Sequence, residues 1–195
     1  KLSEFAMINN ISGLEFMYCI PGSVGGGISM NSGCFGTEFK DRLISLQCID
    51  LKGNIKLIPA NKIKFNYRKT ELEENLIFLS GTFRGSLSNS NDIKLYMDDL
   101  AKKKNNSQPS KIKTGGSTFK NPIDQTDMKA WQLIKKSVPE NLNFGDAYIS
   151  QKHSNFFINK KNASFNEMYS LIKFVKKNVK DKTGIDINLE IKIIE

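Results

Sequence analysis

The spacing of apolar and polar residues predicts short strands and helices in the first half of the chain. Residues 42–50 and 54–58 alternate apolar and polar side chains on either side of a glycine-centred turn, which indicates a β-hairpin. A further apolar run at 76–83 is typical of a strand. Residues 3–10 resemble the end of a helix, and residues 91–103 place their apolar side chains on one helical face.

The same kind of pattern predicts further elements in the second half. A helix is expected over 127–137, with Trp131 in the core, and short strands are expected over 147–150 and 155–159. A capping box that starts at Ser164, followed by apolar residues at spacings of 4, 3 and 4, predicts a long helix ending near a glycine.

The order of these elements predicts an α+β fold in two parts. The chain is expected to close with a strand over 187–194, because alternate residues there are apolar and polar. The segment 105–117 is rich in Pro, Gly, Ser and Lys, a composition typical of a linker or a functional loop. We place the boundary in the helical region before this segment, so that the predicted domains are 1–95 and 96–195.

Composition narrows the possible functions. The 195 residues carry a net charge of +9, and only three of the 29 basic residues are arginine. A solvated lysine-rich surface, an anionic small-molecule ligand or a nucleic acid would each suit this charge, although DNA-reading proteins usually rely on arginine. The three cysteines lack CxxC spacing and His153 is the only histidine, which argues against disulfides and zinc and favours a reducing cytoplasm. No apolar run approaches the roughly 20 residues of a membrane span.

The segment 19–36, CIPGSVGGGISMNSGCFG, is rich in glycine. Glycine lets the main chain take positive φ and lets a ligand approach main-chain N–H groups, so this segment is a candidate phosphate cradle. It lacks the Gly-Lys-Ser/Thr of the Walker pattern, and no strand leads into a glycine trio that opens a helix. From these residues alone, tight turns and a phosphate cradle both remain open.

Five motifs occur in series from about Ile11 to the C-terminus. They are GLEFMYCIPGSVGGGISMNSGCFG (13–36), FNYRKTEL (65–72), GGSTFKNP (115–122), ISQKHSNFFIN (149–159) and INLEIKII (187–194). The series resembles the UDP-N-acetylenolpyruvoylglucosamine reductases, in the shorter of their two subtypes. Members of this family carry several dozen residues before the position that matches Lys1, and the chain starts without Met, so we expect the sequence to be N-terminally truncated.

The resemblance implies an activity and a fold. The activity is the reduction of UDP-N-acetylglucosamine enolpyruvate to UDP-N-acetylmuramate by NADPH through bound FAD, for peptidoglycan precursor synthesis in the cytoplasm. The partners are then a UDP-sugar substrate, no nucleic acid and no membrane, in a monomer. The fold is the C-terminal part of an FAD-binding α+β domain of the vanillyl-alcohol-oxidase-like type, followed by a smaller α+β substrate-binding domain.

Three residues match the catalytic positions of that family. The resemblance implies that Arg68 holds the substrate carboxylate and stabilises an enolate, and that Ser117 donates a proton to the substrate carbon. Glu190 would assist as an acid or a hydrogen-bond partner. Without the motifs, the ordinary interpretations are a surface salt bridge, a turn serine and a solvent-facing glutamate.

The resemblance also implies ligand contacts and leaves alternatives. Contacts with FAD would fall on Pro21, Gly22, Ser23, Val24, Gly25, Gly26, Asn31, Ser32, Gly33 and Gly36. Contacts with the substrate would fall on Tyr67, Lys120, Asn121, Lys152, His153 and Asn155, and no metal ligand is implied. The alternatives are a truncated, non-catalytic relative, a basic module that binds nucleotides or nucleic acid, and, more distantly, a flavoprotein oxidase with the same FAD-binding fold.

Overall fold

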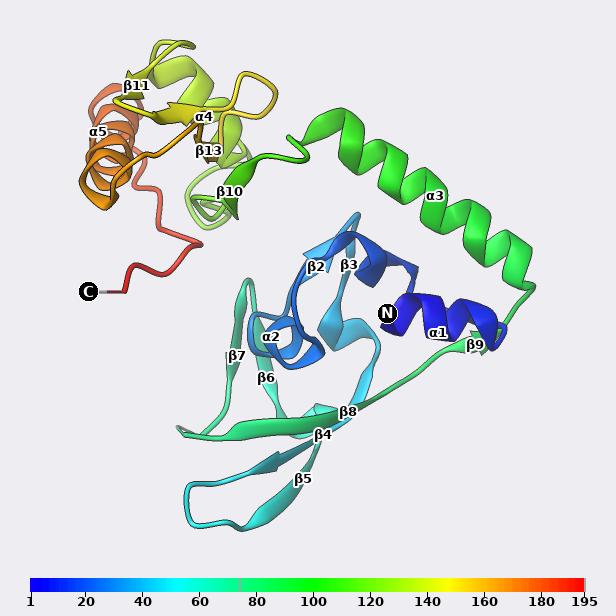
Figure 1. Ribbon diagram of the computed structural model, residues 1–195. Coiled ribbons are helices and arrows are strands. Elements are labelled where there is room, and N and C mark those ends of the chain that lie inside the picture. The colour runs from blue at the N-terminus through cyan, green and yellow to red at the C-terminus, as the bar shows by residue number, and fades with distance from the viewer. Residues whose placement is uncertain (74, 195) are drawn as a thin grey trace. The chain divides into compact units, whose positions relative to one another are not determined.

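The computed structural model describes residues 1–73 and 75–194 (Figure 1). The chain divides into two compact units, Lys1–Lys104 and Asn105–Glu195. Both this division and the domain boundary predicted after residue 95 fall inside one helix, α3 (Ser90–Ser107), which is longer than the predicted 91–103.

The first unit is built mainly from antiparallel strands. Its elements are α1 (Leu2–Ile8), β1 (Ile11–Ser12), the 3-10 helix η1 (Glu15–Cys19), α2 (Val24–Ser29), β2 (Gly33–Cys34), β3 (Thr37–Glu38), η2 (Phe39–Asp41), β4 (Leu43–Ile49), β5 (Ile55–Pro59), η3 (Ala60–Lys62), β6 (Lys64–Asn66), β7 (Lys69–Glu71), β8 (Ile77–Phe83) and β9 (Ser86–Leu87). The largest sheet has the order β5-β4-β8, and β1-β9, β2-β3 and β6-β7 form separate pairs. The predicted hairpin, now β4–β5, and the predicted strand, now β8, are confirmed.

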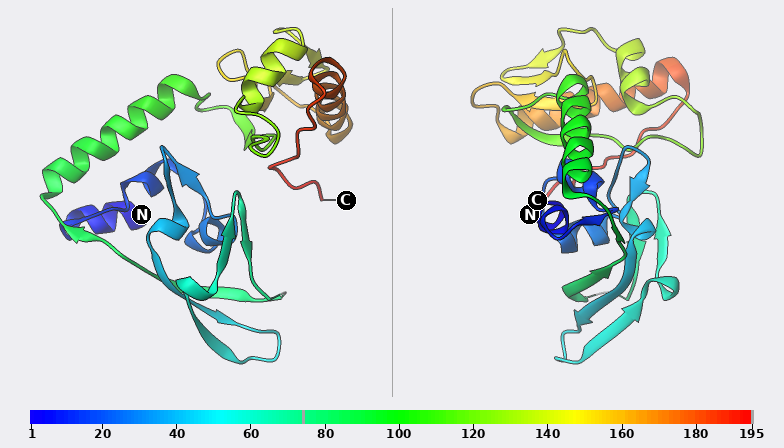
Figure 2. Two further views of the ribbon diagram at one scale, coloured as in Figure 1. Left: turned by 180° about the vertical axis from the view of Figure 1, so that it is seen from behind. Right: turned by 90° about the vertical axis from the view of Figure 1, so that its right-hand side faces the viewer.

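Phe39 is at the centre of the core of the first unit. Its ring makes edge-to-face contacts with Phe16 and Phe83, with centroids 5.9 and 5.8 Å apart. α2 lies near β8 in the first unit (Figures 1 and 2). A Cβ atom on Gly27 would lie 2.3 Å from Cζ of Phe39, so a glycine is required for this close approach.

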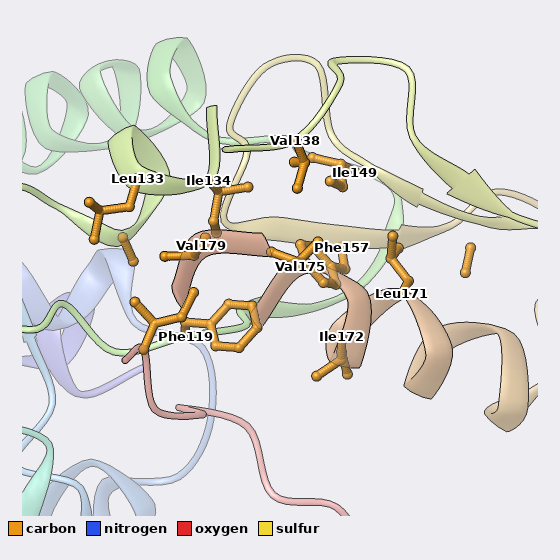
Figure 3. Close-up of a cluster of buried hydrophobic side chains, with 13 residues drawn as sticks. Phe119, Leu133, Ile134, Val138, Ile149, Phe157, Leu171, Ile172, Val175 and Val179 are labelled. Atoms are coloured by element: carbon orange, nitrogen blue, oxygen red, sulfur yellow. The ribbon is translucent and has the colours of Figure 1, made fainter. Parts of the chain in front are cut away.

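The second unit packs two helices against a small antiparallel sheet. Its elements after α3 are β10 (Lys113–Ser117), α4 (Ala130–Ser137), β11 (Asn143–Phe144), β12 (Ala147–Ile149), β13 (Phe156–Asn159) and α5 (Phe165–Thr183). The sheet has the order β10-β13-β12-β11. Phe119, Val175 and Val179 belong to the buried cluster between sheet and helices (Figure 3).

The predicted limits of α5 are confirmed. Ser164 is its N-cap, and the side chain of Ser164 accepts a hydrogen bond from the main-chain N–H of Glu167 at 3.3 Å. Gly184 ends the helix in the left-handed conformation, with φ of 74°. α4 begins later than predicted, at Ala130.

Two predicted segments differ in the structure. The segment 105–117 is not a continuous loop, because α3 extends to Ser107 and residues 113–117 form β10. The predicted strand 187–194 is wrong as a ladder, since it makes only one bridge within the described residues, between Leu189 and Phe119. The facing segment cannot extend the pairing: Gly116 has φ of 85° at one end, and Pro122 lacks an N–H group at the other. The predicted alternation of faces remains, as Ile187 is buried and Asn188 exposed.

Candidate functional site

The glycine-rich segment forms a tight turn followed by the short helix α2. Gly22 has φ of 121°, and the side chain of Ser23 caps α2 by accepting a hydrogen bond of 3.0 Å from the N–H of Gly26. Sequence periodicity did not predict this helix, because glycine is a poor residue for a helix interior. The element before α2 is the 3-10 helix η1 and not a strand, so the segment does not have the strand–glycine–helix order of a dinucleotide fingerprint.

The residues of this segment differ in how much surface they offer to a ligand. Pro21, Gly22, Ser23, Gly26 and Gly36 are exposed, whereas Val24, Gly25, Ser32 and Gly33 are half-buried. A Cβ atom on Gly22 or Gly36 would meet nothing within 4 Å, so the main chain is open at both positions. Both glycines have positive φ, 121° and 85°, so the turns themselves require glycine there, and the exposed main chain is accessible to a ligand.

Asn31 does not share this open surface, since its side chain is 0 % exposed. Its Nδ2 group donates to Oε2 of Glu38 at 2.9 Å and to the carbonyl oxygen of Asn66 at 3.2 Å, and its Oδ1 accepts from the N–H of Lys40 at 3.0 Å. The structure gives Asn31 partners inside the protein, so this residue fixes the surrounding main chain.

Arg68 lies in the turn that joins β6 to β7, immediately beside the Asn31 network. It has φ of 54°, a left-handed conformation that is unfavourable for a residue with a side chain. Its guanidinium lies over the ring of Tyr67 at 4.8 Å, with Nη1 3.8 Å from Oε1 of Glu38 and Nη2 donating to the carbonyl oxygen of Gly33 at 3.4 Å. The side chain is 19 % exposed, so one cation is held in a fixed position with part of its surface open.

The glycine-rich segment contains two cysteine thiols, those of Cys19 and Cys34. Burial raises the pKa of Cys34 to about 11, and burial also raises the pKa of Cys19. Both thiols are therefore protonated at neutral pH and are poor nucleophiles.

Ser117 ends β10 at an irregular point in the second unit. The register of β10 against β13 shifts between Thr114 and Ser117, and Ser117 then pairs with Phe156. Oγ1 of Thr114 donates to the carbonyl oxygen of Phe157 at 2.7 Å and accepts from the N–H of Gly116 at 3.3 Å. This bulge directs the chain into a half-buried Ser117 and a buried Thr118.

Glu190 is brought to the same place from the C-terminal segment. Its N–H donates to the carbonyl oxygen of Thr118 at 2.9 Å, and the N–H of Lys120 donates to the carbonyl oxygen of Asn188 at 2.8 Å. Ser117 and Glu190 thus lie on neighbouring extended segments, joined through the main chain of Thr118. Of the three predicted catalytic residues, these two belong to the second unit and Arg68 to the first.

Residues 117–120 and 188–190 form a short paired strip, and Asn155 and His153 lie next to it. The side chain of Asn155 is bonded to the main chain of Phe119, and Asn155 is only 4 % exposed. His153 accepts a hydrogen bond at Nδ1 from the N–H of Asn155 at 3.3 Å, and its ring contacts Phe156 with centroids 4.8 Å apart. Burial lowers the pKa of His153. Asn155 therefore faces the protein interior.

A cavity of about 700 Å³ adjoins His153, lined in part by Lys152, Ser154 and Trp131. Trp131 is 40 % exposed, so the prediction that it belongs to the core is wrong. Its ring centroid lies 6.2 Å from that of His153. Sequence periodicity alone does not distinguish a buried aromatic residue from one that lines a cavity.

The other predicted substrate residues of this unit follow Ser117. Oδ1 of Asn121 accepts a hydrogen bond of 2.9 Å from the N–H of Ala130, at the start of α4, and Lys120 is half-buried. Asn121 thereby ties the end of the GGSTFKNP motif to the helix.

Residues 1–73 and 75–194 contain no group of three or more His, Cys, Asp or Glu side chains arranged to hold a metal ion. Within the same residues, no helix is both long enough and apolar enough to cross a membrane.

Comparison with known proteins shows which proteins this chain is similar to. Residues 108–194 match the family model of the UDP-N-acetylenolpyruvoylglucosamine reductase C-terminal domain. The chain is 57 % identical over 195 residues to the UDP-N-acetylenolpyruvoylglucosamine reductase of Pelagibacter ubique strain HTCC1062, covering 100 % of this chain and 65 % of that protein. It is 42 % identical over 194 residues to the reductase of Rickettsia bellii strain RML369-C, covering 100 % of this chain and 63 % of that one.

A solved structure agrees with these relatives. The crystal structure of UDP-N-acetylenolpyruvylglucosamine reductase from Thermus caldophilus aligns with a TM-score of 0.84 and 28 % identity, over 98 % of this chain and 67 % of that chain. The chain is thus an α+β protein of the reductase fold. It is homologous to the UDP-N-acetylenolpyruvoylglucosamine reductases along its whole length, which confirms the predicted resemblance.

Proposed function

We propose that this chain carries out, or forms part of a protein that carries out, the reduction of UDP-N-acetylglucosamine enolpyruvate to UDP-N-acetylmuramate for peptidoglycan synthesis. The observation that carries the proposal is the main-chain hydrogen bond from Glu190 to Thr118, the residue that follows Ser117, because it links two segments whose predicted catalytic residues are 73 positions apart in the sequence. The homology to named reductases supports the same conclusion.

The reaction sets clear demands on the protein. A hydride adds to the terminal carbon of the enolpyruvyl double bond, and a proton adds to the neighbouring carbon, which bears the carboxylate. Negative charge therefore builds on the carboxylate oxygens between the two additions. Such an enolate needs a cation or hydrogen-bond donors on its oxygens and an acid beside its carbon.

Arg68 suits the first demand. Its planar guanidinium can donate two parallel hydrogen bonds to a carboxylate, and its high pKa keeps it charged. The contacts with Tyr67, Gly33 and Glu38 hold the group in one position before the substrate arrives. We assign it the substrate carboxylate, with Tyr67 beside it as a further substrate contact.

Ser117 and Glu190 suit the second demand. A hydroxyl is a weak acid, so it can protonate carbon only when the enolate is strongly basic and the hydroxyl is well placed. The bulge at Gly116 and the bonds of Thr118 supply that fixed placement. We assign the proton at Oγ to Ser117, and to Glu190 the support of that transfer as an acid or hydrogen-bond partner.

The exposed main chain of the glycine-rich segment supports binding of FAD. FAD, when bound, relays a hydride from NADPH to the substrate. The contacts would come from Pro21, Gly22, Ser23, Val24, Gly25, Gly26, Ser32, Gly33 and Gly36, and Asn31 would support them from within. Main-chain N–H groups in such turns favour the phosphate oxygens of a dinucleotide.

The UDP-sugar would meet the second unit. Lys152 and His153 line or adjoin the cavity of about 700 Å³, which has room for part of a nucleotide, and Trp131 offers a ring surface there. Lys120 and Asn121 follow Ser117 and would contact the diphosphate or sugar. The proposal includes action in the cytoplasm, as a monomer, without nucleic acid.

The test uses the full-length protein that contains this sequence. Purified protein is titrated with FAD while flavin fluorescence and visible absorption are recorded, and NADPH oxidation is then followed with and without the enolpyruvyl nucleotide. Saturable FAD binding and oxidation that depends on the nucleotide are expected. Absence of nucleotide-dependent oxidation, or salt-sensitive binding to DNA or RNA in its place, would overturn the proposed function.

A further inference from the structure

The strip that carries Ser117 and Glu190 is bordered on its inner side by the side chain of Asn155. Phe119 and Leu189 lie opposite each other as a non-hydrogen-bonded antiparallel pair. The hydrogen bonds between the two segments are made by the residues that flank this pair. The N–H and carbonyl of Phe119 therefore point away from Leu189, toward β13. At this point β13 has not yet begun, because its first residue is Phe156.

The side chain of Asn155 fills the place that a strand would take. Its Oδ1 accepts from the N–H of Phe119 at 3.0 Å, and its Nδ2 donates to the carbonyl oxygen of Phe119 at 2.8 Å. A carboxamide offers one acceptor and one donor group, as a peptide unit does. Asn155 thus continues the pairing by one residue beyond the end of the sheet.

The same asparagine is bonded to Thr118 through its main chain. The carbonyl oxygen of Asn155 accepts from the N–H of Thr118 at 2.8 Å, and the carbonyl oxygen of Thr118 accepts from the N–H of Glu190 at 2.9 Å. A continuous series of bonds therefore runs from Asn155 through Thr118 to Glu190. Ser117 precedes Thr118 directly, so any shift of Phe119 would move both predicted catalytic groups.

We propose that Asn155 is a positioning residue for proton delivery, and that it acts on Ser117 and Glu190 without contacting the substrate. This inference rests on the proposed function. It replaces the predicted substrate contact, because both ends of the carboxamide are bonded inside the protein and the residue is 4 % exposed.

The chain offers a matched control in Asn159. Its Oδ1 accepts from the N–H of Ala163 at 2.9 Å, and its Nδ2 donates to the carbonyl oxygen of Ala163 at 3.4 Å. Asn159 ends β13, the strand that begins directly after Asn155, and it likewise makes two hydrogen bonds to the main chain of one residue. Its partner Ala163 precedes α5 and, within residues 1–73 and 75–194, makes no hydrogen bond to residues 117–120 or 188–190. A general loss of stability should therefore affect both variants, whereas a loss of positioning should affect only the Asn155 variant.

The first experiment measures hydrogen exchange of main-chain amides by NMR, without substrate. In Asn155→Ala the amide of Phe119 loses its acceptor, so we expect its exchange to become at least about 10-fold faster than in the wild type, with a smaller increase at Glu190. In Asn159→Ala the increase should appear at Ala163 and leave Phe119 unchanged. Unchanged exchange at Phe119 in Asn155→Ala would overturn the proposal.

The second experiment separates the two halves of turnover in the full-length protein by stopped-flow absorption. We expect reduction of the bound flavin by NADPH to change by less than about twofold in Asn155→Ala. Reoxidation by the enolpyruvyl nucleotide should slow by about 30- to 100-fold, because displacement of a reacting group by about 1 Å has effects of this size. The solvent deuterium isotope effect on reoxidation should rise, since proton delivery becomes slower.

Asn159→Ala serves as the control in this experiment, with both halves expected within about twofold of the wild type. Asn155→Asp keeps the shape and the acceptor but loses the donor, so it tests the proposal if Asn155→Ala does not fold. Equal loss in both halves, or a reoxidation rate unchanged in a folded Asn155 variant, overturns the positioning role alone. A wild-type protein that is reduced by NADPH but is not reoxidised by the nucleotide overturns the proposed function as well.

Discussion

The turn of Arg68 and the strip of Ser117 hold their proposed catalytic side chains in different ways. The first uses charge and an unfavourable conformation: Arg68 has φ of 54° and lies 3.8 Å from a carboxylate oxygen of Glu38. The second uses neutral main-chain hydrogen bonds, in which Thr118 is bonded to Asn155 and to Glu190. A cationic group that binds an anion can be held in place by other charged groups. A hydroxyl that acts as a weak acid depends more on accurate placement beside the reacting carbon than on the electric field of nearby charges.

Both regions nevertheless depend on a buried asparagine. Asn31 bonds to the main chain of Asn66 and Lys40, and Asn155 bonds to that of Phe119. In each case the carboxamide supplies a donor and an acceptor where the local strand cannot. The two regions thus share the use of a buried asparagine to hold the main chain in place.

The largest expected effect comes from removing the hydroxyl of the strip. Ser117→Ala should slow reoxidation by the enolpyruvyl nucleotide by about 10³-fold, because a general acid contributes about 10²–10⁴-fold. Reduction of the flavin by NADPH should stay near the wild-type rate. Stopped-flow measurement of both halves checks this, and equal loss in the two would contradict the role of Ser117 as proton donor.

The next effect concerns the planar guanidinium group of Arg68 in the first unit. Arg68→Lys keeps the positive charge but loses the planar pair of donors, so we expect about a 10²-fold loss in kcat/KM for the nucleotide. The loss should grow with ionic strength more than that of Ser117→Ala does, because a remaining point charge is screened by salt. Steady-state kinetics at two salt concentrations measure both. Wild-type kinetics in Arg68→Lys would show that the guanidinium fork is not used.

Removal of the other asparagine should act on stability. Asn31→Ala leaves Lys40 N–H and a carboxylate oxygen of Glu38 with fewer partners, so unfolding should become easier by about 2–4 kcal/mol. Urea unfolding of the variant and the wild type gives this difference. A loss below about 0.5 kcal/mol would mean that the network is replaced by water, and that the two asparagines are not equivalent.

The smallest effect is a dependence on pH. Burial lowers the pKa of His153 below its ordinary value of 6.5, so the unfolded chain binds the proton more readily than the folded chain. The stability contributed by neutral His153 is therefore present above pH 6.5 and is lost as the pH falls below it. The thermal midpoint should fall less between pH 7.5 and 5 in His153→Gln than in the wild type. Identical slopes for the two proteins would show that His153 does not contribute.

Sequence patterns predicted the regular elements where local signals are strong. The β4–β5 hairpin has alternating residues on both sides of a turn, and α5 has a cap at each end. They did not predict α2, because its glycines are poor helix formers and the close packing of Gly27 on Phe39 is a tertiary contact that local sequence does not show. The strand 187–194 was predicted wrongly, since the pattern shows the faces of a segment but not whether a partner is available.

The residues of the candidate site were predictable from sequence motifs, but their contacts with one another were not. Motifs indicated Arg68, Ser117 and Glu190, but no motif shows that Thr118 joins two of them. The sequence also does not distinguish a polar residue of a motif that faces a ligand from one that is hydrogen-bonded to the main chain inside the protein. Asn31 and Asn155 could be separated from the exposed residues of their motifs only by their burial and their partners.

The left-handed turn at Arg68 places stability and activity in opposition. Glycine adopts φ of 54° without the roughly 1 kcal/mol that a side chain adds, so selection for a stable fold alone would favour glycine at this position. The contacts of Arg68 with Tyr67, Gly33 and Glu38 offset part of this conformational cost, and the proposed function gives the reason for an arginine there. Sequences of this kind that no longer carry out the proposed reaction should therefore lose Arg68 early, while Asn31, whose carboxamide makes three hydrogen bonds inside the protein, should persist.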